Sequence, residues 1–170
     1  MKRVALLLAA AAALSAQQIR LDLDRLASRA RNAVDISLNR STLQLAARFL
    51  DGSDPDEARV KKLVAALDGI YIRSFEFKRD GEWSSPDLDA VRAQLKSPEW
   101  SRIVGYKGED EGETAEVYVR TSEQKVTGVV ILTAEPREFT VVNIAGPVDL
   151  DTLADLSGHF GVPKLEPPKK

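Results

Sequence analysis

Four extended segments follow one another closely in the second half of the chain, and they constrain the fold more than any other feature. They cover residues 102–107, 114–120, 126–134 and 139–145. Short turns separate them, and strands joined by short turns must run antiparallel. The last two segments are apolar at both alternating positions, which predicts central strands shielded on both faces. The sequence therefore predicts an antiparallel meander.

Alternation within two strands predicts where their side chains point. In the second segment of the meander we expect Val117 and Val119 to face inward, because they alternate with more polar neighbours. The residues expected to face outward are Glu116, Tyr118 and Arg120. An earlier strand over residues 70–77 changes its apolar phase near Ser74, which predicts a bulge or a strand with two covered faces.

Helical patterns dominate the chain before this meander. Apolar residues recur at helical spacing over residues 21–31, 42–50 and 55–68. Asp54-Pro55 strongly indicates the start of the third helix. Aspartate can accept hydrogen bonds from the unpaired N–H groups of the first turn, and proline fits the first helical position. A short extended segment over residues 34–39 lies between the first two helices.

Two more helices complete the predicted order. One covers residues 87–96, and a closing helix starts at Asp149 or Asp151 and runs to Phe160. The sequence thus predicts one α+β domain over residues 17–162. Its helical N-terminal half is expected to pack on one face of a mostly antiparallel sheet, in the order strand, helix, four-strand meander, helix. Residues 163–170 form a Pro/Lys tail with little to bury, and we expect it to be disordered.

The first sixteen residues have the organisation of a secretory signal peptide. A positive head, Met1-Lys2-Arg3, precedes an apolar run over residues 4–14 and then small residues. The run of about eleven residues is too short to span a membrane, which takes about 20 helical residues. We therefore expect an exported protein, periplasmic or extracellular, that matures near Gln17. The chain has no cysteine, so neither a lipid anchor nor disulfides are expected.

Charge and composition exclude several functional classes. The chain has 24 Lys and Arg against 26 Asp and Glu, a formal net charge of −2. A mildly acidic chain without a basic run argues against nucleic acid as a partner. The chain has one histidine and no cysteine, so it lacks the usual ligands of zinc and copper. No cofactor or metal is expected. An acidic tip over residues 109–113 lacks the spacing of a calcium loop, and we interpret it as a solvated turn.

No catalytic arrangement stands out in the sequence. His159 lies only two residues from Ser157, and side chains two apart on a helix point in different directions. Asp149, Asp151 and Asp155 form an acidic group near a glycine corner, but helix capping explains at least one of them. We therefore predict no catalytic residue and expect that the protein is not an enzyme.

Five residues remain as structural or weak binding candidates: Asn143, Gly146, Pro147, Asp149 and Trp100. Asn143 interrupts an otherwise apolar strand, so a buried amide there must find a hydrogen-bond partner, which we expect in the backbone of the Gly146-Pro147 corner. Trp100 is interpreted as an anchor at the core or its rim.

Two stretches carry a resemblance to a known family: Gly128-Val129-Val130-Ile131-Leu132-Thr133-Ala134-Glu135-Pro136 and Val142-Asn143-Ile144-Ala145-Gly146-Pro147-Val148-Asp149-Leu150. They resemble the bacterial envelope family called domain of unknown function 4252, and the likeness covers nearly the whole mature chain. The resemblance implies an exported α+β domain with no assigned activity. It also implies an association with regulators of extracytoplasmic-function sigma factors, and hence with envelope stress. Family members are often lipoproteins, whereas this chain lacks the cysteine.

These observations favour a binding protein of the bacterial envelope. The expected partner is another envelope protein, met through the sheet face or an exposed edge strand. The alternative is a small-ligand binder or hydrolase with a pocket between the helices and the sheet. The sequence leaves the oligomeric state open.

Overall fold

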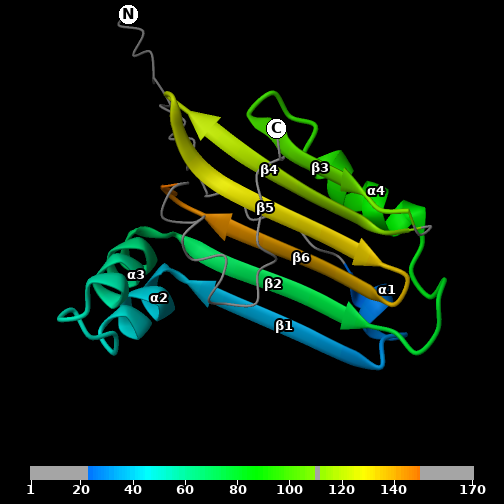
Figure 1. Ribbon diagram of the computed structural model, residues 1–170, viewed down its shortest axis with the longest axis horizontal. Helices are drawn as coiled ribbons and strands as arrows, with labels where there is room; N and C mark the ends of the chain where they lie inside the picture. Colours follow the sequence, from blue (N-terminus) through cyan, green and yellow to red (C-terminus); the bar gives the residue numbers. More distant parts are fainter. Residues whose placement is uncertain (1–22, 110–111, 150–170) are drawn as a thin grey trace, which may run out of the picture.

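The chain forms one antiparallel sheet with helices on both faces (Figure 1). A computed structural model describes residues 23–109 and 112–149. Within these residues the strands are β1 (Asn32–Asn39), β2 (Gly69–Glu76), β3 (Trp100–Lys107), β4 (Thr114–Ser122), β5 (Lys125–Glu135) and β6 (Glu138–Ala145). Their order across the sheet is β1-β2-β6-β5-β4-β3. The predicted meander of four strands is confirmed, and β2 joins it by pairing with β6.

The prediction of a helical N-terminal half is wrong. The described helices are α1 (Asp24–Ala27), α2 (Arg40–Ala47), α3 (Pro55–Ala66) and α4 (Ser85–Gln94). The first has four residues instead of the eleven expected, because the Arg31 N–H already bonds the carbonyl of Glu76 and opens the ladder of β1 with β2. The short extended segment is a full eight-residue strand at the edge of the sheet.

Local capping explains where the longer helices begin. The Asp54 side chain accepts the N–H groups of Asp56 and Glu57 at 2.8 and 3.1 Å, as the sequence predicted for α3. Helix α2 starts earlier than predicted, because Asn39 caps it by accepting the Thr42 N–H at 3.0 Å. These caps set the points at which the chain leaves and rejoins the sheet.

Helices cover both faces of the sheet, so the prediction that they pack on one face is also wrong. We call the first face the α1/α4 face. Its buried core includes Leu23 just before α1, Leu26 of α1, Leu88 and Val91 of α4, and strand residues such as Phe75, Tyr118, Leu132, Phe139 and Val141. On the opposite α2/α3 face, Leu43 of α2 and Leu63, Val64 and Leu67 near α3 pack against Val129 and Ile144. Each face of the sheet thus carries its own apolar cluster, and α2 and α3 cover only one end of theirs.

Two-sided burial corrects the expected side-chain directions in β4. Val117 and Val119 are buried as predicted, but Glu116 and Tyr118 are buried too, because they lie on the α1/α4 face. The phase change in β2 has the same origin. Its pairings with both neighbours run without a break through Ser74, so β2 is a strand with two covered faces and contains no bulge.

Several predictions fall on residues outside the described ranges. They are the signal peptide, the closing helix of residues 150–160 with Asp151, Asp155 and His159, and the tail of residues 163–170. These stay predictions. No helix in the described part of the chain is long and apolar enough to cross a membrane.

Candidate functional site

A row of β-branched side chains crosses the whole sheet on the α2/α3 face. Directly paired positions on the six strands place these residues side by side: Ile36, Ile72, Val142, Ile131, Val117 and Val104. We call this set the aliphatic row. It matters because cross-strand aliphatic neighbours make a continuous apolar strip that no polar side chain interrupts.

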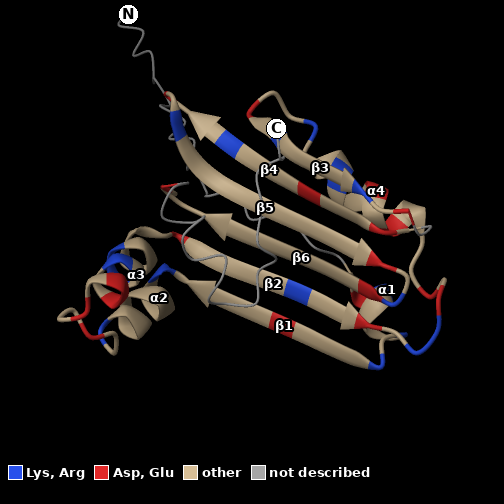
Figure 2. Cartoon of the chain, in the orientation of Figure 1, with Lys and Arg blue, Asp and Glu red and all other residues tan. Residues whose placement is uncertain are grey.

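The aliphatic row is only partly covered. Helices α2 and α3 lie at one end of the sheet (Figure 1), where they pack on the neighbouring line of residues that includes Leu38, Ile70 and Ile144. At the β1 edge, Ile36 is 37% exposed and Val34 beside it is 46% exposed. Figure 2 shows charged residues within β1, β2 and β4 as well as at strand ends, turns and helices. Those inside the three strands alternate with the aliphatic row and so lie on the opposite, α1/α4 face: Asp35, Arg73, Glu116 and Arg120. The open part of this face is thus an apolar surface with a polar border.

Hydroxyl groups border the aliphatic row on the side away from α2 and α3. The next line of paired residues includes Ser74, Thr140 and Thr133. The hydroxyl oxygens of Ser74 and Thr140 are 2.7 Å apart and share a hydrogen bond. A surface of this kind combines apolar area with adaptable hydrogen-bonding groups, as protein interfaces commonly do.

A buried carboxylate lies on the opposite, α1/α4 face. Glu116 is 3% exposed and accepts hydrogen bonds from Arg92 Nη2 at 2.5 Å and from the Tyr118 hydroxyl at 2.7 Å. Arg102 Nη1 lies 3.7 Å away. Burial would raise the pKa of Glu116, but the hydrogen bonds and the two arginine charges outweigh it and hold the pKa below its usual value. The group is therefore a charged structural tie between α4 and the sheet.

The pKa of Tyr118 moves in the opposite direction. Burial and its hydrogen bond to Glu116 raise the pKa of the phenol, so the hydroxyl keeps its proton and remains a donor. Arg92 is held charged by the same contact, since its hydrogen bond to Glu116 raises the pKa of the guanidinium. All three groups are thus in the protonation states that stabilise the cluster.

Asn143 is buried, and its side-chain nitrogen lacks the hydrogen bond that we expected of a buried amide here. The side chain is 1% exposed, and Nδ2 has no hydrogen-bond partner among the described residues. It lies on the α1/α4 face between Tyr71 and Val130. The backbone of the Gly146-Pro147 corner therefore does not accept a hydrogen bond from this amide nitrogen.

Gly146 shapes the corner after β6. Its φ is +118°, and its N–H donates to the carbonyl of Thr127 at 3.0 Å. A Cβ at this position would lie 2.6 Å from the backbone nitrogen of Asp68. Only glycine fits this approach without strain. Pro147 and Asp149 follow it at the surface and are exposed.

Trp100 is a rim anchor, in agreement with its interpretation from the sequence. It is half-buried against the core of the α1/α4 face. Its ring reaches across β4 to Gly128, where an added Cβ would lie 3.4 Å from the ring. Gly128 pairs with Ala145, so Trp100 and the Gly146 corner lie toward the same end of the sheet. The candidate residues thus share one end of the sheet but do not converge on one cavity.

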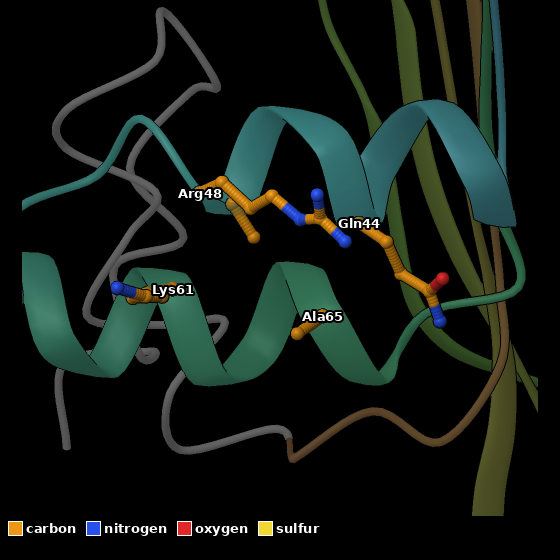
Figure 3. Close-up of a pocket in the computed structure, with 5 residues that line it drawn as sticks. Gln44, Arg48, Lys61 and Ala65 are labelled. Carbon is orange, nitrogen blue, oxygen red and sulfur yellow. The ribbon is translucent and has the colours of Figure 1, made fainter.

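A shallow groove of about 380 Å³ lies between α2 and α3. Gln44 and Arg48 border it from the α2 side, and Lys61 and Ala65 border it from α3 (Figure 3). The Lys61 ammonium donates a hydrogen bond to the carbonyl of Leu50 at 3.3 Å, which ties α3 to the loop that follows α2. The groove includes none of the candidate residues. In the described part of the chain, no three acidic or histidine side chains meet as a metal site would require.

Comparison with known proteins matches the model of the family described as "Domain of unknown function (DUF4252)" over residues 28–156. The chain belongs to this family. The match confirms the resemblance seen in the sequence and includes every described strand. The family description assigns no function, so it transfers no role to any residue. No curated protein matches the chain.

The aliphatic row could have been recognised in the sequence from β-branched residues that alternate along the strands. Val34 and Ile36, Ile70 and Ile72, and Val142 and Ile144 all repeat at a spacing of two. Sequence reasoning missed the row because it depends on register between strands that are distant along the chain. The pairing of β2 with β6 brings these repeats together.

Proposed function

We propose that the chain is an exported, non-catalytic binding protein of the bacterial envelope, and that its binding surface is the open part of the aliphatic row. The partner is another envelope protein that presents an apolar surface. The observation that carries the proposal is the partial exposure of Ile36 in the row and of Val34 beside it. Exposed contiguous apolar area on a sheet face is typical of an interaction site.

The compartment and the biological setting rest on the sequence. The first sixteen residues carry the signal-peptide pattern, which supports export. The family resemblance supports a link to envelope-stress or sigma-factor signalling. The ionisable cluster around Glu116 supports binding over catalysis, since its members are committed to one another: Arg92 and Tyr118 both donate to the carboxylate.

The test compares two variants at neighbouring positions of β2. Ile72→Lys places a charge in the aliphatic row, whereas Tyr71→Lys places it on the other face; both side chains are half-buried. The processed protein and both variants are used to capture proteins from the native envelope. We expect one envelope protein to bind the wild type and Tyr71→Lys and to be lost with Ile72→Lys.

The captured protein is then purified and titrated by calorimetry. A negative heat-capacity change that Ile72→Lys abolishes supports apolar contact through the row. Circular dichroism checks that both variants are folded. A partner that binds Ile72→Lys as well as wild type overturns the assignment of the surface. A co-purified small molecule or substrate turnover, in place of a protein partner, overturns the function and favours the ligand-binding alternative.

A further inference from the structure

The two edges of the sheet differ in how they are protected. On β3 the register shifts between Arg102 and Val104, which marks an irregularity, and Lys107 ends the strand. Bulges and edge charges of this kind discourage pairing with another strand. By contrast, the ladder of β1 with β2 is unbroken over eight residues, and β1 holds neither proline nor lysine. Among the described strands, the β1 edge is therefore the one open for pairing.

Hydrogen-bond alternation shows which groups of β1 are free to pair. The Phe77 N–H donates to the carbonyl of Arg137, which continues the β2–β6 ladder by one pair. In an antiparallel ladder every second residue bonds to a given neighbour. Odd-numbered residues of β2 thus bond to β6 and even-numbered ones to β1. On β1, Val34, Ile36 and Leu38 consequently bond to β2, whereas Ala33, Asp35 and Ser37 direct their backbone groups outward.

The sequence of β1 complements itself in one antiparallel register. Two registers give the longest overlap with a second β1 while keeping opposed side chains on one face. One places Asp35 opposite Asp35, where like charges destabilise the pair. The other places Ile36 opposite Ile36 and Val34 opposite Leu38. It also opposes Asp35 to Ser37, so the outward backbone groups of these two residues meet.

We infer that β1 binds β1 of a second copy in the Ile36–Ile36 register, which joins two sheets into one continuous twelve-stranded sheet. The two-fold axis runs through the Ile36 pair, perpendicular to the sheet. Val34 and Ile36 of both copies, now 46% and 37% exposed, become cross-strand neighbours on one continuous sheet face. Asp35 keeps its ion pair to Arg73 within its own copy at 3.1 Å, so its charge is compensated at the interface. The aliphatic row then continues from one copy into the other.

This inference goes beyond the proposed function, because pairing through the β1 backbone neither requires nor excludes a partner on the sheet face. Failure of one leaves the other standing. Ile72→Lys tests the face and leaves the β1 edge untouched, while the variants below test the edge without a partner protein.

Cysteine cross-linking provides the test, since the chain contains no cysteine of its own. Ile36→Cys places two sulfurs across a non-hydrogen-bonded pair, where Cα atoms are about 4.5 Å apart and a disulfide fits. Asp35→Cys and Val34→Cys are matched controls, since in this register they lie opposite Ser37 and Leu38 of the second copy and not opposite themselves. We expect the processed Ile36→Cys protein to form disulfide dimers about tenfold faster than either control.

A proline variant tests the backbone directly. Ser37→Pro removes an outward N–H and leaves the ladder with β2 intact, as proline does on edge strands. We expect the wild type to elute as a dimer, Ser37→Pro as a folded monomer, and Ile36→Cys/Ser37→Pro to lose the rapid cross-link. A wild type that is monomeric at every concentration, or Asp35→Cys cross-linking as fast as Ile36→Cys, overturns the inference.

Discussion

Arg92 of α4 and Glu116 of β4 form a two-point ion pair between helix and sheet. Nη2 lies 2.5 Å from Oε1, and Nε lies 3.2 Å from Oε2. The carboxylate is 3% exposed, while the Arg92 side chain is 31% exposed. The helix is thus fixed to the sheet by a directional contact in addition to the burial of Leu88 and Val91. Bidentate arginine–carboxylate pairs set orientation more sharply than apolar packing does.

Removal of Arg92 leaves the Glu116 carboxylate buried with fewer partners. We expect Arg92→Ala to lower the free energy of unfolding by about 2–3 kcal/mol, because a buried charge that loses its partner is costly. Urea unfolding of the purified protein measures the change. Arg79→Ala is the control, since Arg79 pairs with Glu82 at 3.3 Å on an exposed turn, and we expect no measurable change. Equal effects of the two variants would contradict a structural role for the buried pair.

The acid dependence of stability follows from the lowered pKa of Glu116. In the unfolded chain this group titrates near pH 4.3, about the value of a free glutamate, and in the folded chain it titrates lower. Its contribution is therefore present above that pH and is lost as the pH falls through the folded pKa. We expect Glu116→Gln to reduce the slope of stability against pH in this acidic window.

Unfolding by urea at several pH values measures that slope. Asp87 leaves a residual slope in the variant: burial would raise its pKa, but hydrogen bonds from Ser84 and the nearby Arg25 lower it. A Glu116→Gln protein with the full wild-type slope would contradict the assignment of the acid dependence to Glu116.

Gly146 is expected to tolerate no side chain. Its φ of +118° and the 2.6 Å approach of an added Cβ to the Asp68 nitrogen both oppose substitution. Gly146→Ala should lower the free energy of unfolding by about 2 kcal/mol or more. Gly52→Ala is the matched control, because the nearest atom to its added Cβ is Lys61 Nζ at 3.9 Å. Thermal unfolding should separate the two, and a Gly146→Ala midpoint equal to that of Gly52→Ala would refute the steric argument.

Substitution of Asn143 is expected to stabilise the protein, unlike the substitutions above. Its buried Nδ2 has no partner in the described structure, so Asn143→Val removes an unsatisfied polar group and adds a β-branched strand residue. We expect the free energy of unfolding to rise by about 1 kcal/mol. Thr140→Val on the same strand is the control, since it removes a hydroxyl that is bonded to Ser74 and should destabilise. Destabilisation by Asn143→Val would show that the amide is satisfied in solution.

The predicted secondary structure succeeded where local signals sufficed. Strands β5 and β6 were evident because both of their faces are apolar, and α3 was evident from the Asp54 cap and the proline after it. Helix α1 was overestimated, because Leu23 and Leu26 are buried in one turn while the following residues turn toward β1. Helical spacing alone could not reveal that the backbone N–H of Arg31 bonds to the carbonyl of Glu76 in β2 and not to a helical carbonyl.

The site was less accessible to sequence reasoning than the fold. Alternation shows that Val117 and Glu116 lie on opposite faces, but it does not show that both faces are covered. The Arg92–Glu116 pair joins residues 24 positions apart and depends on how α4 crosses the sheet. Asn143 was recognised as unusual because of its apolar neighbours, yet the sequence did not show that its side-chain nitrogen has no hydrogen-bond partner among the described residues.

The position of β6 in the strand order governs when the protein can fold. Although β6 is the last strand along the described chain, it occupies an inner place between β2 and β5. Without β6, strands β1–β2 and β3–β5 form two separate ladders, and the edges of β2 and β5 that pair with β6 have no partner. Such exposed strands invite aggregation and proteolysis. A chain truncated before β6 therefore lacks the strand that joins β2 to β5 and cannot form the continuous sheet.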